Sequence, residues 1–248
     1  MTIDQIIALS ASVGAFMSAT AAFLAVRQNM KQRQESYRPE IAIKSIGFEG
    51  TVNPLLGGAL PTYWINQENK GKELNYIDSL SVPMRNVGLG AAKEININWS
   101  FSIEDLVTKI NDLAQRSLIP AFFEYKNEVL SLNSETLGTG ISNWSNQKNT
   151  AIDYILPAPV DDTPTTLYLP QAFKLLISAL IYLSFNFNNK NDEKHSKIPN
   201  LPNLKLDLEY FDIGGVKHKA TFDISITIMS VTGNVESFQG LLKSTKHT

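Results

Sequence analysis

The sequence predicts a mainly β protein with inserted helices, in which an N-terminal transmembrane helix is followed by a β-sandwich-like (Ig-like) domain. Residues 3–26 form one apolar run, and residues 27–38 are rich in Lys and Arg. From residue 39 onward, short segments alternate apolar and polar residues, which is typical of half-buried strands. We therefore divide the chain into a transmembrane helix (1–26), a basic juxtamembrane segment (27–38) and a soluble β domain (39–248).

The first segment has the length and flanks of a membrane span. An apolar run of about 20 residues crosses a hydrocarbon layer of about 30 Å as a helix. Basic residues on one flank hold that flank in the cytoplasm. Here the membrane-flanking residues are Arg27, Lys31, Arg33 and Arg38. We expect a single-pass protein of the inner (plasma) membrane, with its N-terminus outside and its body in the cytoplasm.

Two other interpretations of the first segment stay open. A cleaved signal peptide starts basic and ends at a small-x-small site; this chain starts with the acidic Asp4, but Ala19 and Ala21 fit such a site. The second interpretation is a helix buried in the body, because hydroxyl residues make the run only moderately apolar. These residues are Ser10, Ser12, Ser18 and Thr20.

Small residues recur at every fourth position of the apolar run. Residues four apart share a helix face, and small side chains let two helices approach closely in lipid. The predicted oligomerisation face consists of Ser10, Gly14, Ser18 and Ala22, with Ala11, Ala15 and Ala19 beside them. We expect a homo-oligomer. In a larger ring, this face would line a narrow hydrated path.

Alternation predicts the strands of the body. Residues 204–210 and 220–228 alternate around a turn that contains Gly214 and Gly215, which predicts a β-hairpin. Residues 92–101 predict a half-buried strand. Further strands are expected at 41–43, 81–86, 122–132, 151–156 and 165–169, and polar loops at 142–150 and 186–202.

Two helices interrupt the strands. Residues 103–116 carry one apolar stripe, and Ser102 and Asp105 have capping-box spacing. Residues 171–183 follow Pro170 and are apolar on all sides. A second membrane span is the alternative there, but the short run and Lys174 favour a helix buried in the body.

Composition and motifs argue against catalysis. The net charge is −2 and there are no cysteines, so we expect no nucleic-acid partner, no disulfides and no thiolate zinc site. The three histidines lack metal-ligand spacing. Asp161 and Asp162 lie in a proline-rich turn, and the glycines at 88 and 90 lack the helix of a dinucleotide site. We expect no enzyme activity, no cofactor and no metal.

Tyr63, Trp64 and Trp144 fall in segments without regular alternation. They either anchor a partner or pack back onto the body.

Three segments carry a resemblance to a known group of proteins. They are YRPEI at 37–41, NVGLGAAKEI at 86–95 and LEYFDIGG at 208–215. Together with the apolar N-terminus, they resemble small bacterial proteins with one span and a β-sandwich-like cytoplasmic domain. Some of these resemble membrane effectors of anti-phage defence. The resemblance implies no site residue.

We expect an oligomeric membrane-anchored effector, whose β domain senses a partner and whose clustered helices perturb or permeabilise the membrane. The alternatives are a passive tethered protein-binding module and a tethered enzyme with an unfamiliar site. The expected partners are the lipid bilayer, further copies of the chain and a cytoplasmic protein.

Overall fold

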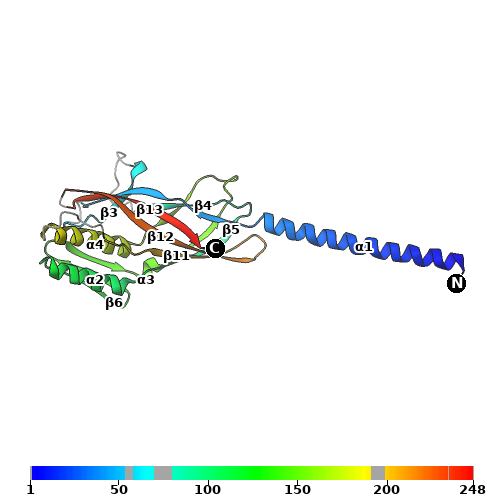
Figure 1. The fold of residues 1–248 in the computed structure, drawn as a ribbon, viewed down its shortest axis with the longest axis horizontal. Helices are drawn as coiled ribbons and strands as arrows, with labels where there is room; N and C mark the ends of the chain where they lie inside the picture. The colour runs from blue at the N-terminus through cyan, green and yellow to red at the C-terminus, as the bar shows by residue number, and fades with distance from the viewer. Residues whose placement is uncertain (1, 54–57, 70–79, 191–198, 234, 248) are drawn as a thin grey trace.

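The computed structural model describes residues 2–53, 58–69, 80–190, 199–233 and 235–247. It has two parts, a long N-terminal helix and a β-rich body from which the helix projects (Figure 1). Strands make up 43% and helices 32%, which confirms the mainly β prediction.

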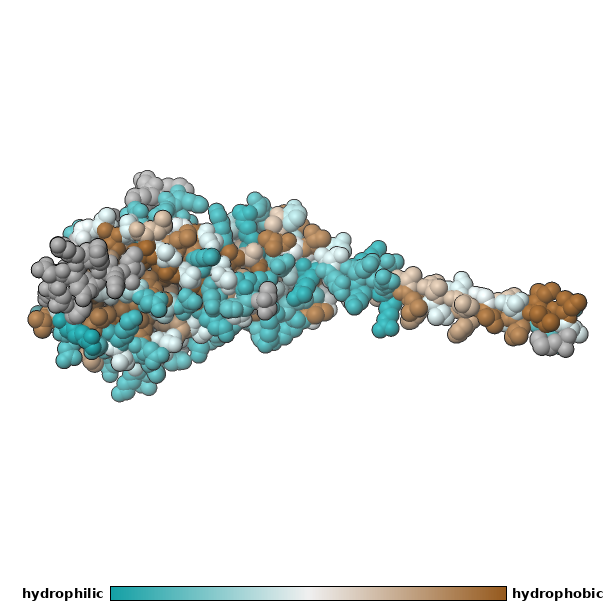
Figure 2. Space-filling model, in the orientation of Figure 1, coloured by the Kyte–Doolittle hydropathy of each residue, from teal (hydrophilic) through white to brown (hydrophobic). Residues whose placement is uncertain are grey.

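Helix α1 (Ile3–Ser36) is one uninterrupted helix of 34 residues, about 50 Å long. All of its described side chains are exposed, so the interpretation as a helix buried in the body is wrong. Its outer part is apolar and its inner part hydrophilic (Figure 2). The helix runs through most of the basic segment and ends before Tyr37, because the residue before Pro39 avoids helical geometry.

The body is organised by an antiparallel sheet of seven strands. Along each strand, apolar residues face the core and polar residues face outward, as period two requires. The order across the sheet is β3 (Tyr63–Asn66), β2 (Ile46–Thr51), β13 (Ser237–His247), β12 (Lys217–Thr232), β11 (Leu204–Phe211), β5 (Ala92–Ser100) and β9 (Asn149–Ile155). The predicted hairpin is confirmed as β11 and β12, which pair from Phe211 and Lys217 onward.

Two three-stranded antiparallel sheets complete the β structure. The first sheet contains β1 (Ile41–Ile43), β4 (Ser81–Asn86) and β10 (Thr165–Tyr168). The second contains β6 (Ala121–Lys126), β7 (Val129–Ser134) and β8 (Gly138–Asn143). The first sheet receives the chain directly from α1, so the helix leads into the body through β1.

Helix α4 (Gln171–Lys190) lies inside the body, below the large sheet (Figure 1). Its side chains are buried almost throughout the first three turns. Ser178 accepts a hydrogen bond from the indole of Trp64 at 3.0 Å, and Phe173 packs edge-on against Phe101. The prediction of a helix buried in the body is confirmed. An Ig-like sandwich of two facing sheets is not shown, because this helix lies against the large sheet.

Helix α2 (Ile103–Arg116) packs against α4 and carries the expected apolar stripe. The predicted capping box does not form, since Ser102 makes no side-chain cap bond. Short helices α3 (Ser145–Lys148) and η1 (Gln67–Asn69) complete the set for the described residues.

Three local predictions were wrong in whole or in part. The strand expected at 122–132 is the β6–β7 hairpin, because Asn127 and Glu128 both adopt positive φ, 52° and 59°, and turn the chain. The loop expected at 142–150 contains α3 and the start of β9 instead. Of the loop expected at 186–202, residues 186–190 belong to helix α4 instead, and residues 191–198 lie outside the described residues.

The three aromatic residues from segments without regular alternation, Tyr63, Trp64 and Trp144, lie in the core. Trp64 is 0% and Trp144 4% exposed, and Trp64 stacks on Phe48 with ring centroids 4.7 Å apart. Tyr63 is buried as well. They pack the body and do not present themselves to a partner.

Lys174 on α4 gives a pH-dependent stability. It is 3% exposed, and burial lowers the pKa of its ammonium group from 10.5 to about 8. Between these pH values the unfolded chain binds more protons than the folded chain. The free energy of unfolding therefore rises with pH in this window, by about 3 kcal/mol in full, and the cost of burying the charge is complete below pH 8.

We expect Lys174→Met to stabilise the protein at pH 7 by about 2 kcal/mol and to remove this rise. Urea unfolding from pH 7 to 10, followed by tryptophan fluorescence in detergent, measures both effects. Lys243→Met on β13, an exposed lysine, is the matched control and keeps the rise. Parallel pH curves for wild type and Lys174→Met would contradict the assignment.

Candidate functional site

Three hydroxyl groups of the apolar run, those of Ser10, Ser12 and Thr20, are satisfied within the helix. Ser10 donates to the carbonyl oxygen of Ile7 at 2.9 Å, and Thr20 donates to that of Phe16 at 2.8 Å. Ser12 makes the same kind of bond to the backbone. In hydrocarbon, every polar group must find an internal partner. These bonds make the moderately apolar run compatible with lipid.

The predicted oligomerisation face is continuous on α1 and unobstructed. A Cβ added at Gly14 would meet nothing within 4 Å. Each residue of the face is exposed, and the structure contains one copy of the chain, so self-association through this face stays a prediction. The face comprises Ser10, Ala11, Gly14, Ala15, Ser18, Ala19 and Ala22.

The basic flank forms a helical stalk between the apolar run and the body. Arg27, Lys31 and Arg33 are exposed on α1, and Arg38 follows just after the helix. Lys31 forms a weak ion pair with Glu35 at 3.9 Å. At the rise of an α-helix, this stalk holds the body about 15 Å beyond the apolar run.

Asn86 fastens the end of α1 to the body. This side chain is 1% exposed and makes four hydrogen bonds. Its carbonyl oxygen accepts from the backbone N–H groups of Glu40 (3.0 Å) and Gly88 (3.1 Å). Its amide donates to the carbonyl oxygens of Gly90 (2.6 Å) and Ile155 (3.3 Å). One buried amide therefore ties together the entry to β1, the loop after β4 and the end of β9.

The loop after β4 closes tightly around the chain that leaves α1. A Cβ added at Gly90 would lie 1.8 Å from the carbonyl oxygen of Tyr37, and one at Gly88 would lie 2.3 Å from that of Arg38. Only glycine permits such an approach. On the other side, the Tyr210 hydroxyl donates to the carbonyl oxygen of Pro39 at 3.5 Å. We call this arrangement the joint; it consists of 37–41, 86–90, Ile155 and Tyr210.

The three segments that carry the sequence resemblance meet at the joint. Residues 37–41 pass through it, 86–95 supply Asn86 and the glycines, and 208–215 supply Tyr210. In this chain the three segments therefore have one structural role, the attachment of α1.

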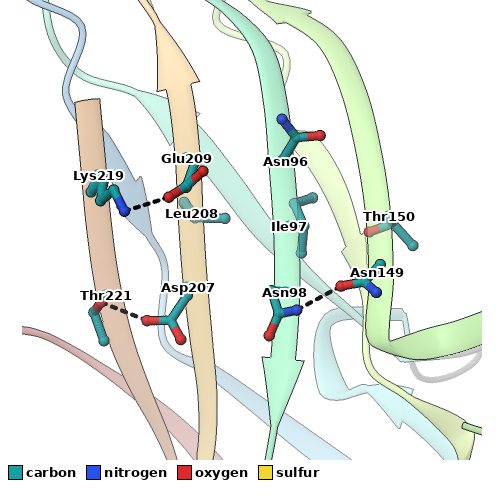
Figure 3. Close-up of a pocket in the computed structure, with 10 residues that line it drawn as sticks. All are labelled: Asn96, Ile97, Asn98, Asn149, Thr150, Asp207, Leu208, Glu209, Lys219 and Thr221. Carbon is teal, nitrogen blue, oxygen red and sulfur yellow. Dashed lines mark hydrogen bonds and ion pairs between the residues drawn. The ribbon is translucent and has the colours of Figure 1, made fainter. Parts of the chain in front are cut away.

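The outer face of the large sheet carries a polar hollow of about 520 Å³ (Figure 3). Its side chains form rows across the strands, because paired residues of neighbouring strands point the same way. One row runs through Asn149, Asn98, Asp207 and Thr221. The hollow is lined by Asn96, Ile97, Asn98, Asn149, Thr150, Asp207, Leu208, Glu209, Lys219 and Thr221.

The polar groups of the hollow pair with one another. The Asn98 amide donates to Asn149 at 2.6 Å, and the Thr221 hydroxyl donates to Asp207 at 2.6 Å. Hydrogen bonds from Lys217 and Lys219 hold the pKa of Glu209 near 2. The carboxylate of Glu209 thus stays ionised and matched by cations across the physiological pH range.

This arrangement of paired polar groups is not poised for acid–base catalysis through Glu209. Glu209 is ionised at neutral pH and unsuited to act as a general acid. His218 contacts Asp212 at 3.1 Å and stacks on Tyr210, away from any nucleophile in the described hollow. Among the described residues, no group of three or more His, Asp or Glu is placed to hold a metal ion. The expectation that the chain is not an enzyme stays a prediction.

The hollow is not among the sites predicted from the sequence. Its signal was present in the polar positions of the alternating strands, where Asn96 and Asn98 on β5 face Asp207 and Glu209 on β11. Alternation shows that such residues point outward, but not that two strands separated by about a hundred residues in sequence lie side by side.

Loss of the Asn86 amide should weaken the joint. Asn86→Ala leaves four backbone groups without their partner, and we expect it to destabilise the protein by about 3 kcal/mol. Asn86→Asp keeps the two accepted bonds, and its stability should fall between those of the wild type and Asn86→Ala. Urea unfolding measures stability, and spin labels on Arg27→Cys and Leu118→Cys measure the spread of distances between α1 and the body. Asn96→Ala, an exposed asparagine, is the control; an Asn86→Ala protein as stable as this control would contradict the role.

Comparisons with protein-family models, with curated proteins and with solved structures found no match to this chain. The resemblance to membrane effectors of anti-phage defence therefore stays a prediction. What can be concluded of the chain is that it joins a mainly β body to one N-terminal helix that is long and apolar enough to span a membrane, the single such helix among the described residues.

Proposed function

We propose that the protein is anchored by α1 in the inner membrane and that its body binds a cytoplasmic partner close to the membrane surface. The observation that carries this proposal is the complete exposure of an apolar helix. Exposed apolar patches of this extent are not stable in water and mark a membrane or protein interface. The length of α1 and its internally bonded hydroxyls favour lipid.

The charge distribution supports the orientation. The Lys and Arg residues of the stalk lie on the side of the body, which favours a cytoplasmic body and an external N-terminus. The stalk and the joint then fix where the polar hollow stands. The partner meets the body at a set height above the bilayer.

A second candidate function is an effector that perturbs the bilayer. The continuous small-residue face of α1 favours it, since close packing of several such helices brings many spans together in one patch of membrane. In this function the body senses the partner and the clustered helices respond. The anti-phage role suggested by the sequence resemblance belongs to this candidate.

Labelling at single cysteines tests the anchor and its orientation. Because the chain has no cysteines, Thr2→Cys and Leu118→Cys each give one site. In intact cells we expect a membrane-impermeant maleimide to label Thr2→Cys, and to label Leu118→Cys only after lysis. Leu118 is 82% exposed on the body.

Protein that stays in the supernatant after ultracentrifugation without detergent would contradict the anchor. A shorter mature protein that lacks residue 2 would instead identify a cleaved signal peptide.

Replacement of Gly14 by Leu tests the small-residue face. A Cβ at this exposed position meets nothing within 4 Å, so we expect the body and the helix to stay intact while close helix packing is blocked. We expect Gly14→Leu to lower the native mass of the detergent-solubilised protein to that of a monomer and to abolish any leakage of dye from vesicles. Val13→Leu, on a neighbouring exposed position, is the control; an unchanged mass for Gly14→Leu would contradict the face.

A further inference from the structure

We infer that the free edge of β9 binds an extended peptide segment of a partner protein, which adds to the large sheet as an eighth strand. This inference rests on the proposed function of the body as a binding module and names the form of its partner. Strand addition gives affinity through backbone hydrogen bonds and specificity through alternate side chains.

The β9 edge is open in the described structure. β9 is the last strand of the seven-stranded sheet, paired with β5 on one side only. Five of its residues are exposed, Ile152 is partly buried, and only Ile155 is buried. Within the described part of the chain, no further backbone hydrogen bond reaches Asn149 to Tyr154. Figure 3 shows β9 as the outermost strand beside the hollow.

The opposite edge of the same sheet differs. β3 is a shorter strand of 4 residues, and its Tyr63 and Trp64 are buried in the core. A partner strand at β3 would have little exposed side-chain surface to contact. Of the two edges of the large sheet, β9 is the one that offers both an exposed backbone and exposed side chains.

The sequence of β9 lacks the usual protection of an edge strand. Natural edges are blunted by proline, lysine or short length, because an unpaired strand recruits other strands. β9 has 7 residues, NTAIDYI, with no proline, no lysine and a single charge at Asp153. An unprotected edge of this kind recruits other strands. Its lack of protection is therefore what we expect of an edge that functions by binding another strand.

The side chains on the two faces of β9 define what would fit. Asn149 and Ala151 lie opposite Asn98 and Asn96 and continue the polar hollow. On the other face, Tyr154 is 62% exposed. An added strand would therefore place alternate polar residues beside the hollow and an apolar residue beside Tyr154. The ligand that fits these two faces is an extended peptide that alternates polar and apolar residues.

A second copy of the chain does not fit this edge. Two identical strands that pair antiparallel are related by a two-fold axis across the strands, which reverses their direction. The strands of the large sheet run roughly along the long axis of the molecule, as α1 does (Figure 1). The two α1 helices would then point in opposite directions and could not share one bilayer. The occupant is therefore a segment of another protein.

The experiment uses the full chain in lipid nanodiscs. The probe is a displayed library of random ten-residue peptides, and the tightest selected peptide is synthesised. Hydrogen–deuterium exchange then reports where it binds. We expect at least tenfold slower exchange for the amides of β9 and little change in β3.

Two proline variants identify the edge. Consecutive backbone N–H groups of a strand point to opposite sides, so of Ala151→Pro and Ile152→Pro one loses a bond to β5 and the other loses only a free donor. We expect the variant that loses only the free donor to keep the wild-type Tm and to bind the peptide at least tenfold more weakly. If both proline variants unfold the protein, Ala151→Lys at an exposed position tests the edge instead. We expect it to weaken peptide binding to a similar extent. Ile141→Lys on β8, also exposed at an edge, is the matched control.

Three results would overturn the inference. They are a library that gives no peptide slowing β9 exchange, edge variants that bind as tightly as wild type, and a dimer of the wild type that the edge variants dissociate. Cysteine labelling tests the anchor independently, so failure of the edge leaves that outcome unaffected. Peptide binding lost in Asn98→Ala but kept in the edge variants would support a binding module that uses the hollow alone, and would also reject the edge.

Discussion

The spatial relation between α1 and the body depends on the buried amide of Asn86. Without this joint, a helix followed by a short connection would swing freely about residues 37–40. The four bonds of Asn86 reach segments that lie 46 and 69 residues away in sequence, and Gly88 and Gly90 let those segments close around the chain. The amide is fully satisfied, which is what makes a buried polar group stabilising and specific. The body is therefore carried at a defined orientation to the axis of α1.

Two apolar helices of this chain have opposite surroundings, and their composition explains the difference. α4 has large side chains on every face and lies between the large sheet and α2, so its apolar area is removed from water by the body itself. α1 has small residues on one face and no partner within the body. The body itself therefore leaves the apolar surface of α1 uncovered. Lys174 in α4 shows that a core can accept one charge where packing is dense, at a cost in stability.

Local patterns predicted the elements whose cause is local. The β11–β12 hairpin followed from strict alternation around glycines, and α2 was predicted at its observed bounds, Ile103–Arg116. The turn between β6 and β7 was missed because Asn127 and Glu128 adopt left-handed geometry without a glycine. The joint and the hollow could not be predicted, since both are made by strands distant in sequence. The resemblance segments were recognisable as turns, but their meeting point is a property of the fold.

The hollow and the β9 edge differ in the net free energy that a bound ligand would gain. In the hollow, Asp207, Glu209 and Asn98 already have partners, so a ligand must replace existing hydrogen bonds and gains little net free energy. Within the described residues, the outer backbone groups of Asn149 to Tyr154 have no backbone partner, so a bond to an added strand would form there without breaking a backbone hydrogen bond. In the proposed complex, backbone hydrogen bonds at the edge supply the affinity, and the paired side chains of the hollow select among the strands that lie beside it. Because the joint holds the chain that leaves α1 against the body, the β9 edge keeps one orientation relative to α1.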